Sequence, residues 1–478
     1  MARRDPRHAG PARDPWLHLV PTLVVLLVLA AAVVSWRVTG RADAEDSGPA
    51  SVPPPPGLSL PSPAPLSPVA RPAGPSGPTS LDPARVGEAL APSLHDHDLG
   101  RHVRVLVAPV QQGAAPVFSS GRGVATPAST MKLLTTTAAL DALGPEHTFT
   151  TKVVDAARGR VVLVGGGDPY LASKPVDRAT YPQRADVRTL ARETAAELAR
   201  DGRRRVRLGY DASLFTGPAV DPHWPADYVP DGVVAPITAL WVDEGRTASG
   251  TKVADPARAA ADAFAAALRK AGVAVRGKPR PETAPAGATE LAAVRSAPLA
   301  EIVEETLTVS DNEAAEVLGH QVGLAVAGTG SFRAGAEAVE QTLTGLGVPL
   351  DGAWIHDGSG LSREDRLDPR TLLAVLQLAA DPGHPDLRAV VTGLPVAGFT
   401  GSLDDRFDQS APQGRGRVRA KTGTLTGISA LAGIATDRDG EAMVFALMSD
   451  KVALVDTLGA RAALDDLAAS LAACHCGR

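Results

Sequence analysis

Two polar residues in the stretch TPASTMKLLT, Ser129 and Lys132, are spaced to act as a nucleophile and its base. Residues three apart lie on one face of an α-helix. A serine hydroxyl is a poor nucleophile unless a base accepts its proton. A lysine amine with a pKa of about 10.4 is neutral only about once in 2,500 at pH 7, so it becomes a base only where burial or a second cation lowers that pKa. The alternative is an exposed serine and a solvated lysine on an ordinary amphipathic helix.

Two further segments complete a signature. Ser310, Asp311 and Asn312 form the sequence SDN at a break between two predicted helices, and KTGT occupies 421–424 in a predicted strand. Alone, the first segment could cap a helix and the second could end a strand. Together and in this order, S-x-x-K, S-D-N and K-T-G are the signature of class A β-lactamases and penicillin-binding proteins.

Segments outside the three motifs resemble one particular family among the proteins that share this signature. They are GGGDPYL (165–171), DGSGLSR (357–363), LPVAGFTGSL (394–403) and KTGTLTGISALAG (421–433). They resemble the penicillin-binding D-alanyl-D-alanine carboxypeptidase/endopeptidase family, peptidase family S13, over most of 82–473. The resemblance implies an α/β (α+β) fold: a β-lactamase/transpeptidase-like catalytic domain, with an antiparallel sheet flanked by helices, and one inserted smaller domain.

The resemblance also implies catalytic roles. Ser129 is the acyl-enzyme nucleophile and Lys132 is its general base. Ser310 relays a proton to the leaving amine. Asn312 hydrogen-bonds the peptide amide of the substrate and helps to hold Lys132.

The third motif is expected to bind the substrate. By the same resemblance, Lys421, Thr422 and Thr424 receive the terminal carboxylate of D-Ala-D-Ala. The N–H groups of Thr424 and Ser129 form the oxyanion hole, and Gly423 lets the substrate backbone approach the strand. Lys421 is also the candidate second cation that lowers the pKa of Lys132. No metal or cofactor is implied.

The expected activity is a serine-type D-Ala-D-Ala carboxypeptidase or endopeptidase. It acts on peptidoglycan stem peptides through an acyl-enzyme and is inhibited by β-lactams. A β-lactamase of the same superfamily is one alternative, although no glutamate motif supplies a deacylation base. A catalytically inactive, membrane-tethered cell-wall-binding protein is another. His356 and Asp357 could form a Ser-His-Asp triad, but Lys132 already supplies a base.

Local patterns predict the elements that position these residues. The stretch 102–110 alternates like a strand, and APVFSS continues the same sheet. Thr126 as cap, with Pro127 at the first helical position, predicts a helix over 127–143. The sequence after 415 predicts three antiparallel strands with a turn at 437–440 and a closing helix over 452–472.

The domain boundaries follow from these elements. Residues 82–150 and 296–473 are expected to form a discontinuous catalytic domain, and 151–295 an inserted domain. Within the insert, helices are predicted over 187–200 and 256–271. The insert is short for the two extra domains that long members of the family carry, so we expect one.

The N-terminus predicts a membrane anchor. Residues 1–16 carry four arginines against two aspartates, which predicts a cytoplasmic tail. Residues 17–36 carry no formal charge, and 20 helical residues span roughly 30 Å, the thickness of a bilayer core. The Pro-rich stretch 37–81 predicts a linker. The catalytic part would then be extracytoplasmic in the cell envelope, or secreted if the helix is a signal peptide cleaved near RADA (41–44).

The composition gives little support to other classes of function. The chain has 478 residues with a formal net charge of −5, which gives no indication of nucleic acid binding. Its two cysteines, Cys474 and Cys476, are too few for a disulfide framework. With His475 they offer three ligands where a structural zinc site usually needs four. We therefore expect the C-terminal tail to be disordered.

Overall fold

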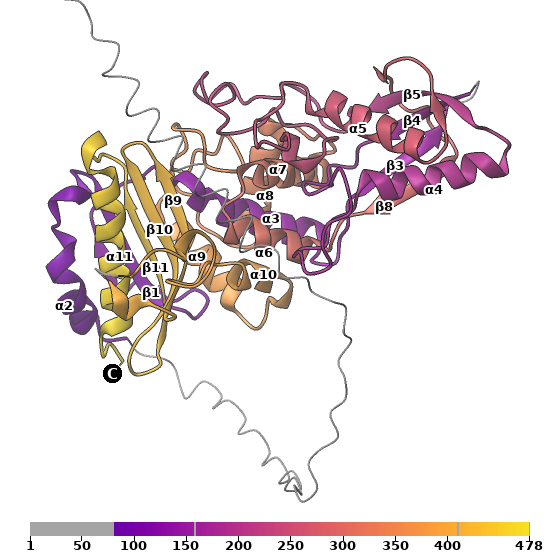
Figure 1. The fold of residues 1–478 in the computed structure, drawn as a ribbon. Helices are drawn as coiled ribbons and strands as arrows, with labels where there is room; N and C mark the ends of the chain where they lie inside the picture. The colour runs from indigo at the N-terminus through magenta and orange to yellow at the C-terminus, as the bar shows by residue number, and fades with distance from the viewer. Residues whose placement is uncertain (1–80, 157–158, 409–410, 478) are drawn as a thin grey trace, which may run out of the picture. The chain divides into compact units, whose positions relative to one another are not determined.

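An antiparallel sheet of five strands carries the third motif on its edge. The computed structural model describes residues 81–156, 159–408 and 411–477. The strand order is β2-β1-β11-β10-β9 (Figure 1). The strands are β1 (Val103–Pro109), β2 (Phe118–Ser120), β9 (Val418–Leu425), β10 (Ile428–Thr436) and β11 (Ala442–Ser449). β10 and β11 are almost continuously apolar because helices cover both of their faces.

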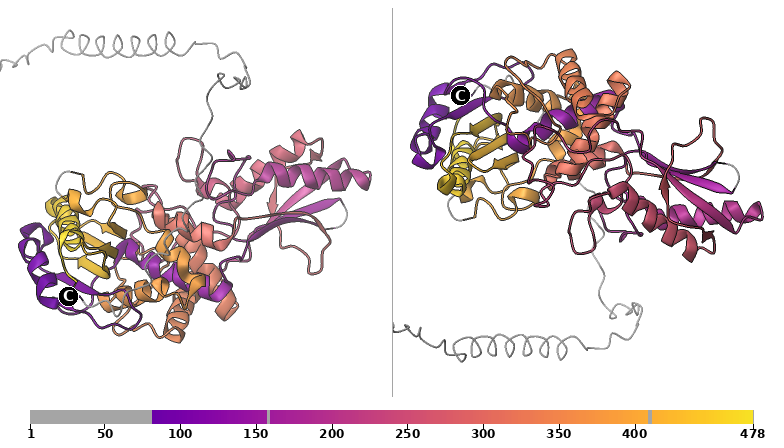
Figure 2. Two further views of the ribbon diagram at one scale, coloured as in Figure 1. Left: turned by 90° about the horizontal axis from the view of Figure 1, so that it is seen from below. Right: turned by 90° about the horizontal axis from the view of Figure 1, so that it is seen from above.

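Helices form a layer on each face of this sheet (Figures 1 and 2). One apolar cluster joins the sheet to α2 (Pro83–Leu94) and α11 (Thr457–Ala473). A second cluster lies on the other face and joins it to α3 (Lys132–Leu143), α6 (Leu299–Thr308), α7 (Asn312–Ala327), α8 (Phe332–Gly345), α9 (Pro369–Ala380) and α10 (Arg388–Thr392). This arrangement confirms the predicted antiparallel sheet flanked by helices.

The nucleophile lies just before α3. The structure has a 3₁₀ turn over Ala128–Met131 and an α-helix only from Lys132, rather than one α-helix over 127–143. Thr126 does not cap it, because its Oγ1 accepts a hydrogen bond from Arg366 instead. Every residue of α3 from Lys132 to Leu140 is buried. A helix buried on all sides belongs inside the core, so Lys132 is surrounded by protein.

The second sheet lies within the predicted insert. Its order is β6-β5-β4-β3-β8, with β7 paired to β5. The strands are β3 (Thr150–Asp155), β4 (Arg160–Val164), β5 (Arg205–Asp211), β6 (Ala274–Val275), β7 (Arg280–Pro281) and β8 (Glu290–Arg295). Helices α4 (Val187–Arg200) and α5 (Pro256–Lys270) pack on one face of this sheet. Asp186 caps α4 and Asp255 caps α5, so both helices begin where their sequences predict.

Part of the predicted insert packs on the catalytic helices instead. Trp224 and Trp241 share an apolar cluster with Val317 of α7 and Phe332 of α8. The backbone N–H of Ala235 also donates a hydrogen bond to Glu313 on α7 at 3.0 Å. The segment between β5 and α5 is therefore one wall of the catalytic region.

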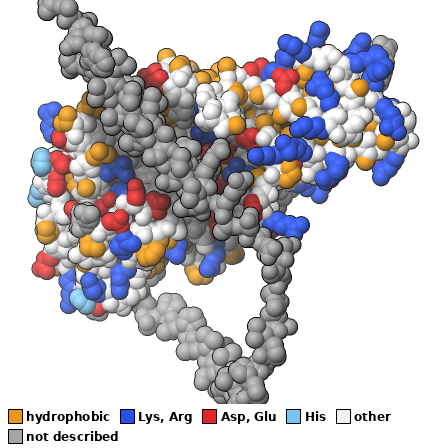
Figure 3. All heavy atoms as spheres, viewed as in Figure 1, with side chains coloured by type: hydrophobic (Ala, Val, Ile, Leu, Met, Phe, Trp, Pro, Cys, Tyr) orange, Lys and Arg blue, Asp and Glu red, His pale blue; other side chains and the backbone are white. Residues whose placement is uncertain are grey.

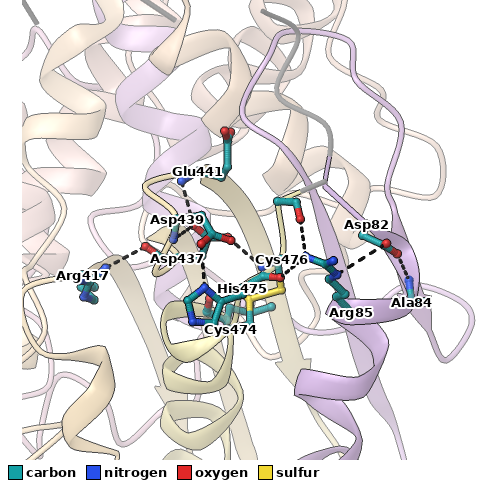
Figure 4. The surroundings of a disulfide bond; sticks show 12 residues. Asp82, Ala84, Arg85, Arg417, Asp437, Asp439, Glu441, Cys474, His475 and Cys476 are labelled. Carbon is teal, nitrogen blue, oxygen red and sulfur yellow. Dashed lines mark hydrogen bonds and ion pairs between the residues drawn. A yellow bond between two sulfur atoms is a disulfide. The ribbon is translucent and has the colours of Figure 1, made fainter. Parts of the chain in front are cut away.

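The C-terminus is ordered, and its two cysteines form a disulfide, Cys474–Cys476 (Figure 4). Cys476 is buried, and its N–H donates to Asp437 Oδ2 at 3.0 Å. Its carbonyl accepts from the N–H of Asp82 at 2.8 Å, and Arg85 donates to the two neighbouring carbonyls. The expectation of a disordered tail is therefore wrong. Asp437 lies 39 positions before Cys476, and Arg85 lies about 390 positions before the carbonyls that it binds, so tail composition alone could not reveal these partners.

The predicted cytoplasmic tail (1–16), anchor (17–36) and nearly all of the linker (37–81) lie outside the described residues. Among the residues that the structure describes, no helix is long and apolar enough to cross a bilayer.

Candidate active site

The turn that carries Ser129 is held from two sides by glycines. Ala128 has a φ of 46°, in the left-handed region that L-residues rarely adopt. A Cβ on Gly360 would lie 1.9 Å from the carbonyl oxygen of Ala128, and a Cβ on Gly423 would lie 2.6 Å from that of Pro127. Only glycine permits these approaches. Gly423 is therefore required by the packing of β9 against the nucleophile turn, whatever it also permits to a substrate.

Lys132 lies beside the nucleophile with its ammonium group fully hydrogen-bonded. Its Nζ donates to Ser129 Oγ at 2.9 Å, to Asn312 Oδ1 at 2.7 Å and to the carbonyl of Ser359 at 2.9 Å. These use all three donors of a protonated amine. The geometry fixes Nζ where it can accept the Ser129 proton once the amine is neutral.

Burial makes that neutral form accessible. It lowers the pKa of Lys132 to about 8, although nearby carboxylates, Glu316 first among them, oppose the shift. Burial is thus the cause, rather than the second cation that the sequence suggested. With a pKa of about 8, about a tenth of the molecules carry a neutral amine at pH 7, against about one in 2,500 for a free lysine.

The second motif lies at the junction of α6 and α7. Ser310 has a φ of 62° just after α6 ends, and Asp311 caps α7 by accepting from the N–H of Ala314. The left-handed backbone conformation of Ser310, between the two helices, directs its hydroxyl toward Lys421 of the third motif. Asn312, the first residue of α7, reaches Lys132.

The third motif supplies a buried cation. Lys421 Nζ donates to Ser310 Oγ at 2.7 Å and to the carbonyl of Thr422 at 2.9 Å. Burial lowers the pKa of Lys421 well below its usual value, and the positive charges of Lys132 and Arg406 lower it further. Each of the two lysines thus holds one serine hydroxyl: Lys132 that of Ser129, and Lys421 that of Ser310.

The free edge of β9 presents backbone groups to this site. At its start, the N–H of Ala420 donates to Pro395 on the side away from β10. Backbone groups two residues apart point to the same edge of a strand. The N–H groups of Thr422 and Thr424 therefore also point to that edge, where Gly423 meets the Ser129 turn. The Thr422 hydroxyl is held by Ser402 at 2.8 Å, and Thr424 is exposed.

Sequence reasoning missed one carboxylate that supports this site. Glu316, buried on α7, accepts from the N–H groups of Gly358 at 3.0 Å and Ser359 at 2.8 Å. It thereby fixes the loop whose carbonyl holds Lys132. The DGSG sequence indicated a turn, but nothing in the sequence linked that turn to Glu316.

The alternative triad is not formed. Asp357 accepts from Trp224 Nε1 at 2.7 Å and from the N–H groups of Gly360 and Ser362, and His356 stacks on His223 with ring centroids 4.0 Å apart. Donor atoms of His223, His356 and Glu364 lie within 4.8 Å of one another, which suits a three-ligand metal site. Neither histidine is among the hydrogen-bond partners of Ser129 or Lys132.

Comparison with known proteins shows to which family a chain with this site belongs. The model of the D-Ala-D-Ala carboxypeptidase 3 (S13) family matches residues 86–252 and 246–471. The chain belongs to this family. It is 38% identical to carboxypeptidase DacB of Mycolicibacterium smegmatis, over 96% of each chain. It is 31% identical to the D-alanyl-D-alanine carboxypeptidase of an Actinomadura species, over 68% of this chain and 73% of that one.

The fold of the S13 family is also seen in a solved structure. Penicillin-binding protein 4 (DacB) of Haemophilus influenzae superposes with a TM-score of 0.64 at 21% identity. The superposition covers 82% of this chain and 98% of that one. This S13 chain therefore has the β-lactamase/transpeptidase-like fold that the resemblance implied.

Proposed function

We propose that this chain is a serine-type D-Ala-D-Ala carboxypeptidase that acts through an acyl-enzyme on Ser129. One observation carries the proposal: the buried amine of Lys132, with a pKa of about 8, lies 2.9 Å from the Ser129 hydroxyl. The S13 family membership and the carboxypeptidase relatives agree with it.

Acylation follows from this geometry. Neutral Lys132 accepts the Ser129 proton as Oγ attacks the carbonyl carbon of the penultimate D-Ala. The negative charge that develops on the carbonyl oxygen faces the N–H groups of Ser129 and Thr424. The proton reaches the leaving amine through Ser310, which Lys421 holds at 2.7 Å. The C–N bond breaks, D-Ala leaves, and the ester on Ser129 remains.

Lys421 gives the site its preference for a carboxylate. The buried Lys421 amine lies on an edge strand, and in its protonated form it attracts the terminal carboxylate of the substrate, whose charge in turn favours that form. The hydroxyls of Thr422 and Thr424 add hydrogen bonds. The same chemistry would cleave a D-amino-acid cross-link, so we propose endopeptidase activity as a second reaction of this site. Release of D-Ala from monomeric stem peptides, compared with cleavage of cross-linked ones, measures the balance.

Inhibition by β-lactams follows from the same acylation. Within the described part of the chain, no carboxylate hydrogen-bonds to Ser129 or Lys132. A dedicated deacylation base is thus missing from their immediate partners, which favours a slowly hydrolysed penicilloyl ester over β-lactamase turnover. The penicillin-binding protein 4 of H. influenzae, which shares the fold, has been crystallised with a β-lactam.

The location is likewise a proposal. The uncharged run 17–36 behind a basic N-terminus supports a single membrane anchor, with the catalytic domain outside the cell. Protease treatment of intact cells tests it: the catalytic domain should be cleaved while a tag on residue 1 stays protected. Protection of the catalytic domain would refute this location.

The chemistry is tested by Ser129→Ala, with Ser119→Ala, at the exposed position of strand β2, as the control. The first variant should lose both labelling by a fluorescent penicillin and D-Ala release, and the control should keep both. Continued labelling of folded Ser129→Ala protein would show that the nucleophile is another residue.

A further inference from the structure

A group of cationic side chains lies on the second sheet, on the face opposite α4 and α5. Val161 and Leu163 of β4 belong to the apolar cluster under those helices. Side chains alternate between the faces of a strand, so Arg160 points the other way. On β5, Val206 faces the helices and Arg207 does not. Arg160 and Arg207 are direct partners in the β4–β5 register, which sets them side by side.

These two arginines line a hollow of about 570 Å³, here called the basic hollow. The residues around it include five cations and one carboxylate: Arg160, Arg207, Arg276, Lys278, Arg280 and Glu282. Gly277 and Leu208 complete the lining, although the side chain of Leu208 packs in the cluster under α4 and α5. Figure 3 shows Lys and Arg side chains gathered over the part of the molecule where Figure 1 labels β4 and β5.

Most of these charges are unpaired. Arg160 lies 3.3 Å from Glu282. Arg207, Arg276, Lys278 and Arg280 form no ion pair with any residue that the structure describes. Four uncompensated cations in one hollow repel each other and favour the binding of an anion that bridges them.

The chemistry of the hollow favours phosphate. Guanidinium groups bind phosphate oxygens in a bidentate manner, and four of the five cations are arginines. A membrane surface would also attract cations, but proteins that lie on membranes usually insert large apolar side chains. In the described residues, the exposed large apolar side chains all lie outside β4, β5 and β7. No aromatic side chain lines the hollow to stack on a nucleic acid base.

We propose that the basic hollow binds a linear polymer that carries repeated phosphate groups. A polymer of this kind would hold the enzyme by several weak contacts at once, while the peptidase site works on a separate ligand. The proposal goes beyond the peptidase function and does not depend on acylation at Ser129.

The test uses the full-length chain in detergent, with fluorescent linear inorganic polyphosphate as the probe. The triple variant Arg207→Gln, Lys278→Gln, Arg280→Gln removes three charges from the hollow. The control variant Arg192→Gln, Arg269→Gln, Lys270→Gln removes three exposed charges from α4 and α5, on the opposite face. In about 0.1 M salt the first should bind about tenfold or more weakly than wild type, with a shallower salt dependence, and the control within about twofold.

Two results would overturn the proposal: wild-type protein that fails to bind polyphosphate, or a control variant that loses as much affinity as the hollow variant. A third would replace it. If the hollow variant loses binding to soluble short-chain phosphatidylglycerol but keeps polyphosphate binding, the hollow serves a lipid surface. If the triple variant does not fold, the single variant Arg280→Gln replaces it, with an expected loss of polyphosphate affinity of about two- to threefold.

Penicillin labelling of Ser129 in the same samples separates the two proposals. It should be equal in all variants, because the hollow contains none of the proposed catalytic residues. If wild-type protein is not labelled by penicillin, the peptidase proposal is refuted, and the proposal on polyphosphate binding is unaffected.

Discussion

The contact between β9 and the nucleophile turn gives the sharpest prediction. In Gly423→Ala, the added Cβ would lie 2.6 Å from the carbonyl oxygen of Pro127 and 3.2 Å from the backbone nitrogen of Ser129. Both atoms belong to the turn that presents the nucleophile. The substitution therefore acts on the oxyanion hole without removing any catalytic side chain.

The movement that the added Cβ requires determines how much rate and stability are lost. Because neither neighbour is the flexible end of a side chain, strand and turn must separate by about 0.5–1 Å to restore van der Waals contact. A misplacement of about 1 Å at a reacting centre costs up to about 10²-fold in rate. We expect acylation by a fluorescent penicillin to slow by about 10- to 100-fold. Overpacking should lower the free energy of unfolding by about 1–3 kcal/mol.

The assay is the second-order rate of penicillin labelling, measured together with thermal unfolding. Gly345→Ala is the matched control, because a Cβ at this helical glycine meets nothing within 4 Å. It should label at the wild-type rate. If folded Gly423→Ala protein labels as fast as wild type, the close contact is not what positions the nucleophile, and the reasoning fails.

Three further predictions follow from the same contacts. The pKa of Lys132 is about 8 and its neutral form is the base, so labelling should slow about 50-fold from pH 8 to pH 6; a rate that is flat over this range would exclude Lys132 as the base. Lys421→Gln should lower kcat/KM for D-Ala release by about 10- to 100-fold through loss of a charged hydrogen bond. With a substrate whose C-terminus is amidated the loss should be smaller, because only the contact of Lys421 with Ser310 is then lost; an equal loss with both substrates would show that Lys421 does not bind the carboxylate. Cys474→Ala opens the disulfide to Cys476, which closes only a three-residue loop. The free energy of unfolding should fall by about 1–2 kcal/mol, seen as a lower guanidinium midpoint; an unchanged midpoint would show that the disulfide does not stabilise the fold.

Local structure was largely predictable from the sequence. The helix predicted over 187–200 has those bounds in the structure, because an aspartate cap and a regular apolar pattern lie next to each other in the chain. The three last strands and the turn at Asp437 were also predictable, because turn residues separate apolar runs in this part of the sequence. The prediction failed at the nucleophile turn. There the packing of Gly360 and Gly423 imposes a left-handed residue on a sequence that favours a regular helix start.

The sequence by itself determined the order and spacing of the three motifs, and through them the family. Those are properties of the covalent chain, readable without coordinates. The tertiary structure alone decided that the Lys132 amine is buried, that Ser310 meets Lys421, and that Glu316 holds the loop behind them. The physical reason is that a pKa depends on how much water is removed from a group, and the segments that contact the Lys132 amine come from positions 180 and 227 residues further along the chain.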